Sequence, residues 1–198
     1  MDIIIATGNE NKVREIRQIL SGLSDKVISM KEAGISCDIE ENGETFAENA
    51  LIKARAVAAH CDGVVIADDS GLCVDAMGGA PGVYSARFMG EETPYSEKNA
   101  AIIETLSGLE GQDRSARFVC AMAGVLPNGE EFVVEGVMEG QIAKESAGEN
   151  GFGYDPIFFL PEYGKTSAEI APEEKNRISH RGKALRGIRE ELSKHLGV

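Results

Sequence analysis

Residues 64–71 read VVIADDSG, an apolar run that passes directly into two aspartates, a serine and a glycine. The run from Val64 to Ala67 is short, continuous and largely β-branched, which predicts a buried strand. We expect this strand to end at the aspartates and the chain to continue extended over residues 72–76. Two carboxylates at a strand end suit a magnesium ion and offer a general base. The alternative is an Asx turn, in which the aspartates cap their own backbone.

The chain before this stretch alternates between strand and helix patterns. Residues 2–6 predict a short buried strand, and a glycine turn after it leads into an amphipathic helix. Residues 27–30 and residues 37–41 predict two more strands. Residues 45–48, TFAE, match a capping box, which predicts a long alanine-rich helix ending at about Cys61.

The chain after this stretch adds a hairpin to the pattern. Thr93 fits an N-cap, followed by proline at the first helical position, which predicts a helix over residues 94–106. Residues 116–126 and 131–142 predict two strands, because the tripeptide PNG between them favours a tight turn. A further strand is expected over residues 156–160.

A last helix is expected from Arg181. Because the hairpin breaks a simple alternation of strands and helices, we predict a mixed α/β fold with a mixed central β-sheet flanked by helices. No linker or repeat divides the sequence, so residues 1–198 are expected to form one domain.

Charge and cysteine content exclude several classes of protein. Lys and Arg number 20 against 33 Asp and Glu, a formal net charge of −13, which argues against a nucleic-acid or membrane-surface binder. No apolar stretch reaches the length of a membrane span, and the start of the chain lacks the pattern of a signal peptide. The four cysteines form no C-x-x-C pair or zinc motif, so we expect free thiols and a cytoplasmic location.

Residues 7–12, TGNENK, join the first strand to the first helix. A glycine turn at a helix N-terminus presents free N–H groups and the positive end of the helix dipole, which suit a phosphate. Lys12 lies one turn into the helix, where its charge could reach the same anion. Such turns are common, and a purely structural turn is the alternative.

Three other groups of residues could join the aspartates. Glu40 and Glu41 alternate in direction if extended, so only one of them is expected to face the site. Lys53, on the alanine-rich helix, could supply a positive charge or be a surface lysine. Residues 151–156, GFGYDP, offer aromatic rings and an acid for a purine base, although both aromatics could equally be core residues. His180 and Arg181 are expected at the start of the last helix.

Taken together, these segments closely resemble the inosine triphosphate pyrophosphatase family. The matching segments are TGNENK (7–12), ETFAENALIKA (44–54), ADDSGL (67–72), GGAPGVYSAR (78–87), GFGYDP (151–156) and SHR (179–181). The resemblance implies a long mixed sheet, two lobes with a nucleotide cleft between them, and a homodimer. It also implies Mg²⁺-dependent hydrolysis of ITP, dITP and XTP to the monophosphate and pyrophosphate.

The resemblance also implies roles for individual residues. Asp69 would accept a proton from water and bind the metal, with Glu41 as the second ligand and Glu40 as its alternative. Asp68 and Lys53 would assist at the phosphates. The residues expected to contact substrate are Thr7, Gly8, Asn9, Lys12, Ser70, Phe152, Gly153, Tyr154, Asp155, Lys175, His180 and Arg181.

Two alternative functions are weighed against this one. The first is a pyrophosphatase for modified pyrimidine nucleotides, as in the related septum-inhibition family, whose typical serine-proline-arginine-arginine loop near the N-terminus is absent here. The second is a nucleotide sensor that binds without turnover.

Overall fold

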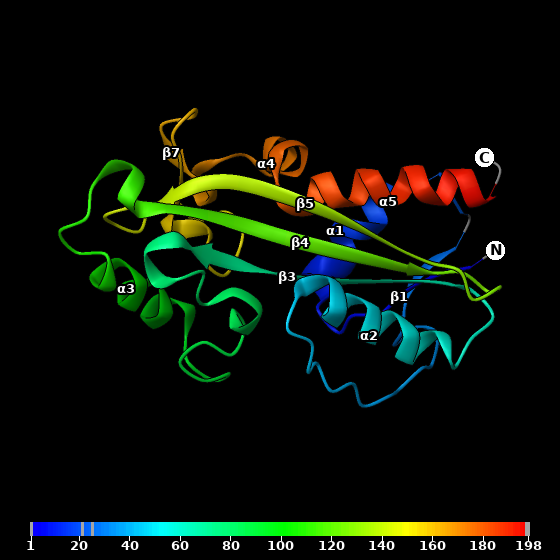
Figure 1. Ribbon diagram of the computed structural model, residues 1–198. Coiled ribbons are helices and arrows are strands. Elements are labelled where there is room, and N and C mark those ends of the chain that lie inside the picture. The colour runs from blue at the N-terminus through cyan, green and yellow to red at the C-terminus, as the bar shows by residue number, and fades with distance from the viewer. Residues whose placement is uncertain (1, 21, 25, 197–198) are drawn as a thin grey trace. The chain divides into compact units, whose positions relative to one another are not determined.

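The computed structural model describes residues 2–20, 22–24 and 26–196. Its seven strands form one mixed sheet in the order β2-β1-β3-β4-β5-β6-β7. β1 pairs in parallel with β2 and β3, whereas β6 pairs antiparallel with β5 and β7. The predicted mixed α/β fold with a central mixed sheet is therefore confirmed (Figure 1).

The helices and strands have the following bounds: β1 Ile3–Ile5, α1 Glu10–Leu20, β2 Val27–Ser29, α2 Phe46–Ala58, β3 Val64–Val74, α3 Tyr95–Thr105, β4 Ser115–Val125, β5 Glu131–Ile142, β6 Phe158–Leu160, β7 Lys165–Thr166, α4 Pro172–Ile178 and α5 His180–Leu196. None of the described helices is both long enough and apolar enough to cross a membrane.

The chain divides into two compact units. The first contains Met1–Asp69, Cys120–Gly136 and His180–Val198, and the second contains Ser70–Val119 and Val137–Ser179. The strands β3, β4 and β5 each pass from one unit into the other. That residues 1–198 form one domain stays a prediction.

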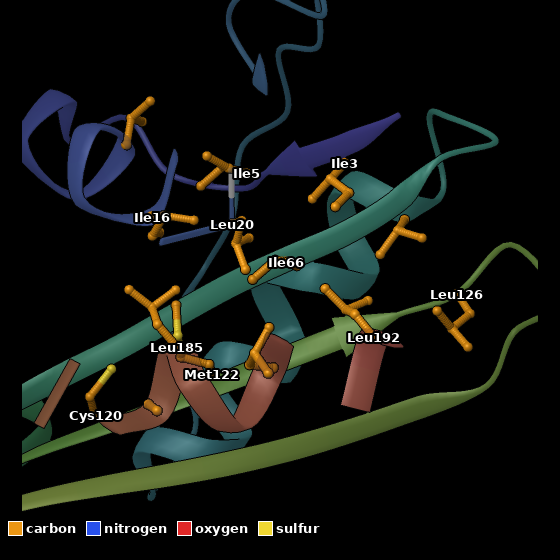
Figure 2. Close-up of a cluster of buried hydrophobic side chains, with 14 residues drawn as sticks. Ile3, Ile5, Ile16, Leu20, Ile66, Cys120, Met122, Leu126, Leu185 and Leu192 are labelled. Atoms are coloured by element: carbon orange, nitrogen blue, oxygen red, sulfur yellow. The ribbon is translucent and has the colours of Figure 1, made fainter. Parts of the chain in front are cut away.

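In the first unit, successive strand residues point to opposite faces of the sheet. Ile3, Ile5 and Ile66 pack with α1 and α5, as Figure 2 shows for the labelled core residues Leu20, Leu185 and Leu192. The residues between them pack with α2: Ile4, Ala6, Val65 and Ala67 meet the small side chains Ala50 and Ala54. Figure 1 shows α2 on one side of the strands β1 and β3, and α1 with α5 on the other. The period-two pattern thus determines which helix each β3 side chain meets.

In the second unit, the core lies around α3, residues 115–119 of β4 and the turn before β6. Its buried members include Leu72, Ile102, Phe118, Tyr154 and Phe158. The rings of Phe118 and Phe158 lie 4.5 Å apart between centroids. Arg114 joins the segment after α3 to the end of β5. Its buried guanidinium donates hydrogen bonds to the backbone carbonyls of Leu106, Leu109, Ile142 and Ala143.

Three predictions about secondary structure are wrong. The aspartates do not end a strand, because β3 runs unbroken from Val64 to Val74. Residues 37–41 form no strand. The cap of α3 is Pro94 rather than Thr93, whose hydroxyl instead donates to the Met89 carbonyl at 2.7 Å.

The remaining differences lie at the ends of elements. α2 stops at Ala58, three residues before the predicted end. Residues 155–157 form a short 3₁₀ turn, so β6 begins only at Phe158. The sequence patterns predicted neither β7 nor α4. Both are short, of two and seven residues, and carry little periodicity.

Candidate active site

Asp68 and Asp69 are neighbours on β3, yet their side chains belong to different networks. Asp68 lies on the face of the sheet that carries Ile66, toward α1 and α5, and Asp69 lies on the face that carries Ala67, toward α2. Strand geometry alone separates the two carboxylates. All the contacts described next lie within the first unit.

The carboxylate of Asp68 is enclosed by positive charge. Only 1% of the residue is exposed; its Oδ2 lies 2.9 Å from Lys12 Nζ on α1 and 3.7 Å from Arg181 Nε on α5. Burial by itself would raise the pKa of Asp68, but the charges of Lys12, Arg181 and Lys53 outweigh burial and hold that pKa well below its ordinary value. Asp68 is therefore ionised at neutral pH.

Arg181 is held in this place by α1 and by a glycine on β5. Its Nη1 donates to Glu15 Oε2 at 2.6 Å. A Cβ at Gly136 would stand 2.1 Å from the carbonyl oxygen of His180, so the start of α5 can approach β5 only over a glycine. The same surroundings keep the pKa of Arg181 above its ordinary value: burial opposes the charge, but Asp68 and Glu15 more than compensate.

The carboxylate of Asp69 is bound by α2. Asn49 Nδ2 donates to Asp69 Oδ2 at 3.1 Å, and Lys53 Nζ lies 3.4 Å from Asp69 Oδ1. The donors are four residues apart and so lie on one face of the helix. Burial raises the pKa of Asp69, with a further contribution from Glu41, and the opposing effects of Lys53 and Asn49 do not cancel this shift. A carboxylate with a raised pKa suits a proton acceptor.

Glu41, rather than Glu40, faces Asp69. Lys53 Nζ donates to Glu41 Oε2 at 2.9 Å, whereas Glu40 is exposed. Ile35, Cys37 and Ile39 pack against the core beside α2 and are half-buried like Glu41, whereas the residues between them are exposed. Burial disfavours the charged form of Lys53, but Asp69, Asp68 and Glu41 together raise its pKa above the ordinary value.

The turn before α1 is organised by its own side chains. Asn9 Oδ1 accepts from the backbone N–H groups of Asn11 and Lys12 at 3.0 and 3.3 Å, and Thr7 Oγ1 accepts from Asn9 N at 3.2 Å. Asn9 is thus the N-cap of α1. Gly8 is exposed, with open space where a Cβ would stand. The structure therefore brings Lys12 to Asp68, and the binding of phosphate by this turn stays a prediction.

In the second unit, Asp155 closes the glycine loop before β6. Its carboxylate accepts from Phe152 N at 2.8 Å, Ser167 Oγ at 2.8 Å and Lys175 Nζ at 2.5 Å. Gly151 has φ +79°, and a Cβ there would stand 2.2 Å from Asp155 Oδ2, so the loop requires glycine at this position.

The two aromatic residues of this loop differ. Phe152 is 36% exposed and has Lys175 Nζ 5.6 Å from its ring centroid, so it is no core residue. Tyr154 is buried: its hydroxyl donates to the Ser85 carbonyl at 2.6 Å and its ring packs edge-on against Tyr95. Tyr154 is therefore a core residue. The roles predicted for this loop and for half-buried Ser70 stay predictions.

Sequence reasoning assigned no role to Asn49 or Glu15. Asn49 could have been found, because it precedes Lys53 by one helical turn and so shares its face. Glu15 could not, since its partner Arg181 lies 166 residues away in the chain.

Comparisons with known proteins identify the family of the chain. The model of the Ham1 family matches residues 3–191. A dITP/XTP pyrophosphatase of Caldanaerobacter subterraneus subsp. tengcongensis is 50% identical over 195 residues, which cover 98% of this chain and 97% of that protein. One of Geobacillus kaustophilus is 47% identical over 196 residues, covering 99% and 96%. A solved HAM1 protein of Coxiella burnetii is 42% identical, covers 98% of this chain and 99% of its own, and has a TM-score of 0.90.

Proposed function

The chain belongs to the Ham1 family, and from this premise we propose that it is a pyrophosphatase that hydrolyses ITP, dITP and XTP to the monophosphate and pyrophosphate. The name of the two relatives above, dITP/XTP pyrophosphatase, supports this substrate class. The observation that carries the proposal is that the two neighbouring aspartates on β3 have different surroundings and opposite pKa shifts. Asp68 is ionised within a cationic network, and Asp69 is a carboxylate of raised pKa beside a lysine.

Hydrolysis consumes one water and breaks the anhydride between the α- and β-phosphates. In our proposal Asp69 accepts the proton of that water. Lys53, kept charged by Asp69, Asp68 and Glu41, offsets the phosphate charge that builds up as the bond breaks. Lys12, with Thr7, Gly8 and Asn9, holds the phosphates, and Ser70 contacts the substrate.

The residues around Asp69 fit a magnesium ion. Mg²⁺ is usually held by one or two carboxylates, with water and phosphate oxygens completing its shell. Asp69 and Glu41 supply two carboxylates, which lie 3.4 and 2.9 Å from Lys53 Nζ. Among the described residues, no group of three or more acidic, histidine or cysteine side chains suited to a metal occurs. When bound, the ion polarises water and neutralises phosphate charge.

The base of the nucleotide is assigned to Phe152, Gly153, Tyr154, Asp155 and Lys175, together with His180 and Arg181. An exposed ring beside a lysine supports a stacking role for Phe152. Tyr154, in contrast, would act by supporting the loop from the core. A homodimer, a cytoplasmic location and the absence of nucleic-acid or membrane partners also remain part of the proposal.

A substrate panel tests the proposal directly. Purified protein with Mg²⁺ should release pyrophosphate from ITP and XTP much faster than from ATP, because a site that hydrogen-bonds a 6-oxo group rejects an amino group by orders of magnitude. Orthophosphate as the sole inorganic product would contradict the reaction proposed. Saturable ITP binding without any product would favour a nucleotide sensor, and faster turnover of modified pyrimidine nucleotides would favour the other pyrophosphatase.

A further inference from the structure

The side chain of Asn49 links two parts of the site. It is fully buried on α2; its Nδ2 donates to Asp69 Oδ2 at 3.1 Å, and its Oδ1 accepts from the backbone N–H of Gly43 at 2.8 Å. A planar amide has its donor and acceptor at fixed positions. The two hydrogen bonds therefore join β3 to the segment that precedes α2.

That segment carries Glu41 and is held firmly against the start of α2. The carboxylate of Glu48 accepts from Glu44 N at 2.7 Å and from Thr45 N at 3.1 Å, which forms one half of a capping box. A Cβ at Gly43 would stand 2.7 Å from Asn49 Oδ1 and 2.7 Å from Glu48 Cβ. Only a glycine at this position lets the backbone approach Asn49 closely enough to bond.

Packing alone does not account for an asparagine here. A buried amide is costly unless its polar atoms are bonded, and asparagine is a poor helix former. A leucine of similar size would fill the same space with neither cost. Both polar ends of Asn49 are bonded, one to a carboxylate of the site and one to the segment bearing the other carboxylate.

We propose that Asn49 is a positioning residue that sets the spacing between the Asp69 and Glu41 carboxylates. Lys53 draws both carboxylates together by charge, at 3.4 and 2.9 Å, but its flexible stem does not fix their separation. Residues that hold metal ligands in place typically contribute about 10- to 100-fold to metal affinity. The inference rests on the proposed function, because it takes these two carboxylates to be the metal ligands.

Direct binding of Mn²⁺, followed by electron paramagnetic resonance without nucleotide, tests this role apart from catalysis. Asn49→Leu removes both hydrogen bonds while keeping the number of side-chain heavy atoms, and Gly43→Ala breaks the link from its other end without changing Asp69. Val57→Ala is the matched control. It truncates a buried side chain on the same helix, two turns beyond Asn49, and this side chain packs in the apolar cluster beside α2. Thermal unfolding of each variant shows how far stability falls.

The inference predicts that Asn49→Leu and Gly43→Ala each raise the Mn²⁺ dissociation constant about 10-fold or more, while Val57→Ala changes it less than twofold. If Asn49→Leu does not fold, Gly43→Ala decides alone. An unchanged constant in Gly43→Ala, an equal loss in Val57→Ala, or a wild-type protein that binds no Mn²⁺ would overturn the inference. Wild-type protein that binds Mn²⁺ but does not hydrolyse ITP would refute the proposed function and leave the role of Asn49 standing.

Discussion

Replacing each of the two neighbouring aspartates by asparagine should separate stability from catalysis. Asp68→Asn removes the negative charge that Lys12 and Arg181 enclose, and leaves both cations facing a neutral amide. Removing one partner of a buried ion pair costs about 3 to 5 kcal/mol. For a chain of this length, each kcal/mol lowers the melting temperature by about 2 to 4 °C, so the expected fall is about 6 to 20 °C.

Asp69→Asn should behave in the opposite way. The raised pKa of Asp69 means that its ionised form destabilises the fold, and this cost is present once the pH has risen through the folded-state pKa. A neutral amide avoids it, so the melting temperature should stay level or rise. Pyrophosphate release should fall by about 10²- to 10⁴-fold, the usual contribution of a general base.

The pH dependence of unfolding adds a check on Asp68. Its folded-state pKa lies below the ordinary value of 3.8, so its stabilisation is present above about pH 4 and is lost as the pH falls toward the folded-state pKa. The difference in melting temperature between wild type and Asp68→Asn should therefore be constant near neutral pH and shrink below pH 4.

Circular dichroism melts with EDTA present, together with a pyrophosphate assay, measure both effects. Because the two substitutions are chemically identical and adjacent, each variant is the control for the other. An Asp68→Asn protein within about 0.5 kcal/mol of wild type, the range of ordinary surface substitutions, would refute the ion-pair argument. So would an Asp69→Asn protein that unfolds earlier than Asp68→Asn.

Three further predictions follow from other parts of the structure. Gly151→Ala should raise the KM for ITP in a steady-state assay, because the added Cβ would displace the Asp155 carboxylate. Gly164→Ala is the control: Gly164 has a φ of +62°, close to the +79° of Gly151, but open space where a Cβ would stand, so the KM should stay near wild type. Arg114→Met should lower stability by about 3 kcal/mol in urea titrations, since several buried carbonyls lose a charged donor, and a loss below about 0.5 kcal/mol would contradict that role. Removal of divalent metal should weaken ITP binding at least about 10-fold by calorimetry, because a chain of net charge −13 attracts a polyanion only through local positive charges such as the metal. Equally tight binding of ITP in EDTA would contradict this role of the metal.

Local patterns predicted much of the fold because they report backbone preferences directly. The apolar run before Asp68 formed a strand, and the TFAE motif formed the capping box at the start of α2. Where the prediction was wrong, the cause was non-local. Residues 68–71 contain turn-forming types, yet they continue β3, which lies in the sheet beside the equally long strand β4. Residues 37–41 have a strand pattern but form no strand.

The sequence by itself determined that two adjacent carboxylates follow a buried apolar run and that only one of Glu40 and Glu41 faces inward. The second property depends only on the period of two in extended chain. Only the tertiary structure decided which charges each carboxylate meets: Lys12 and Arg181 for Asp68, Asn49 and Lys53 for Asp69. The pKa of Asp68 is lowered and that of Asp69 raised, although they are the same residue type on the same strand. The physical reason is that burial and Coulomb energy depend on distances in space, which helices from opposite ends of the chain establish.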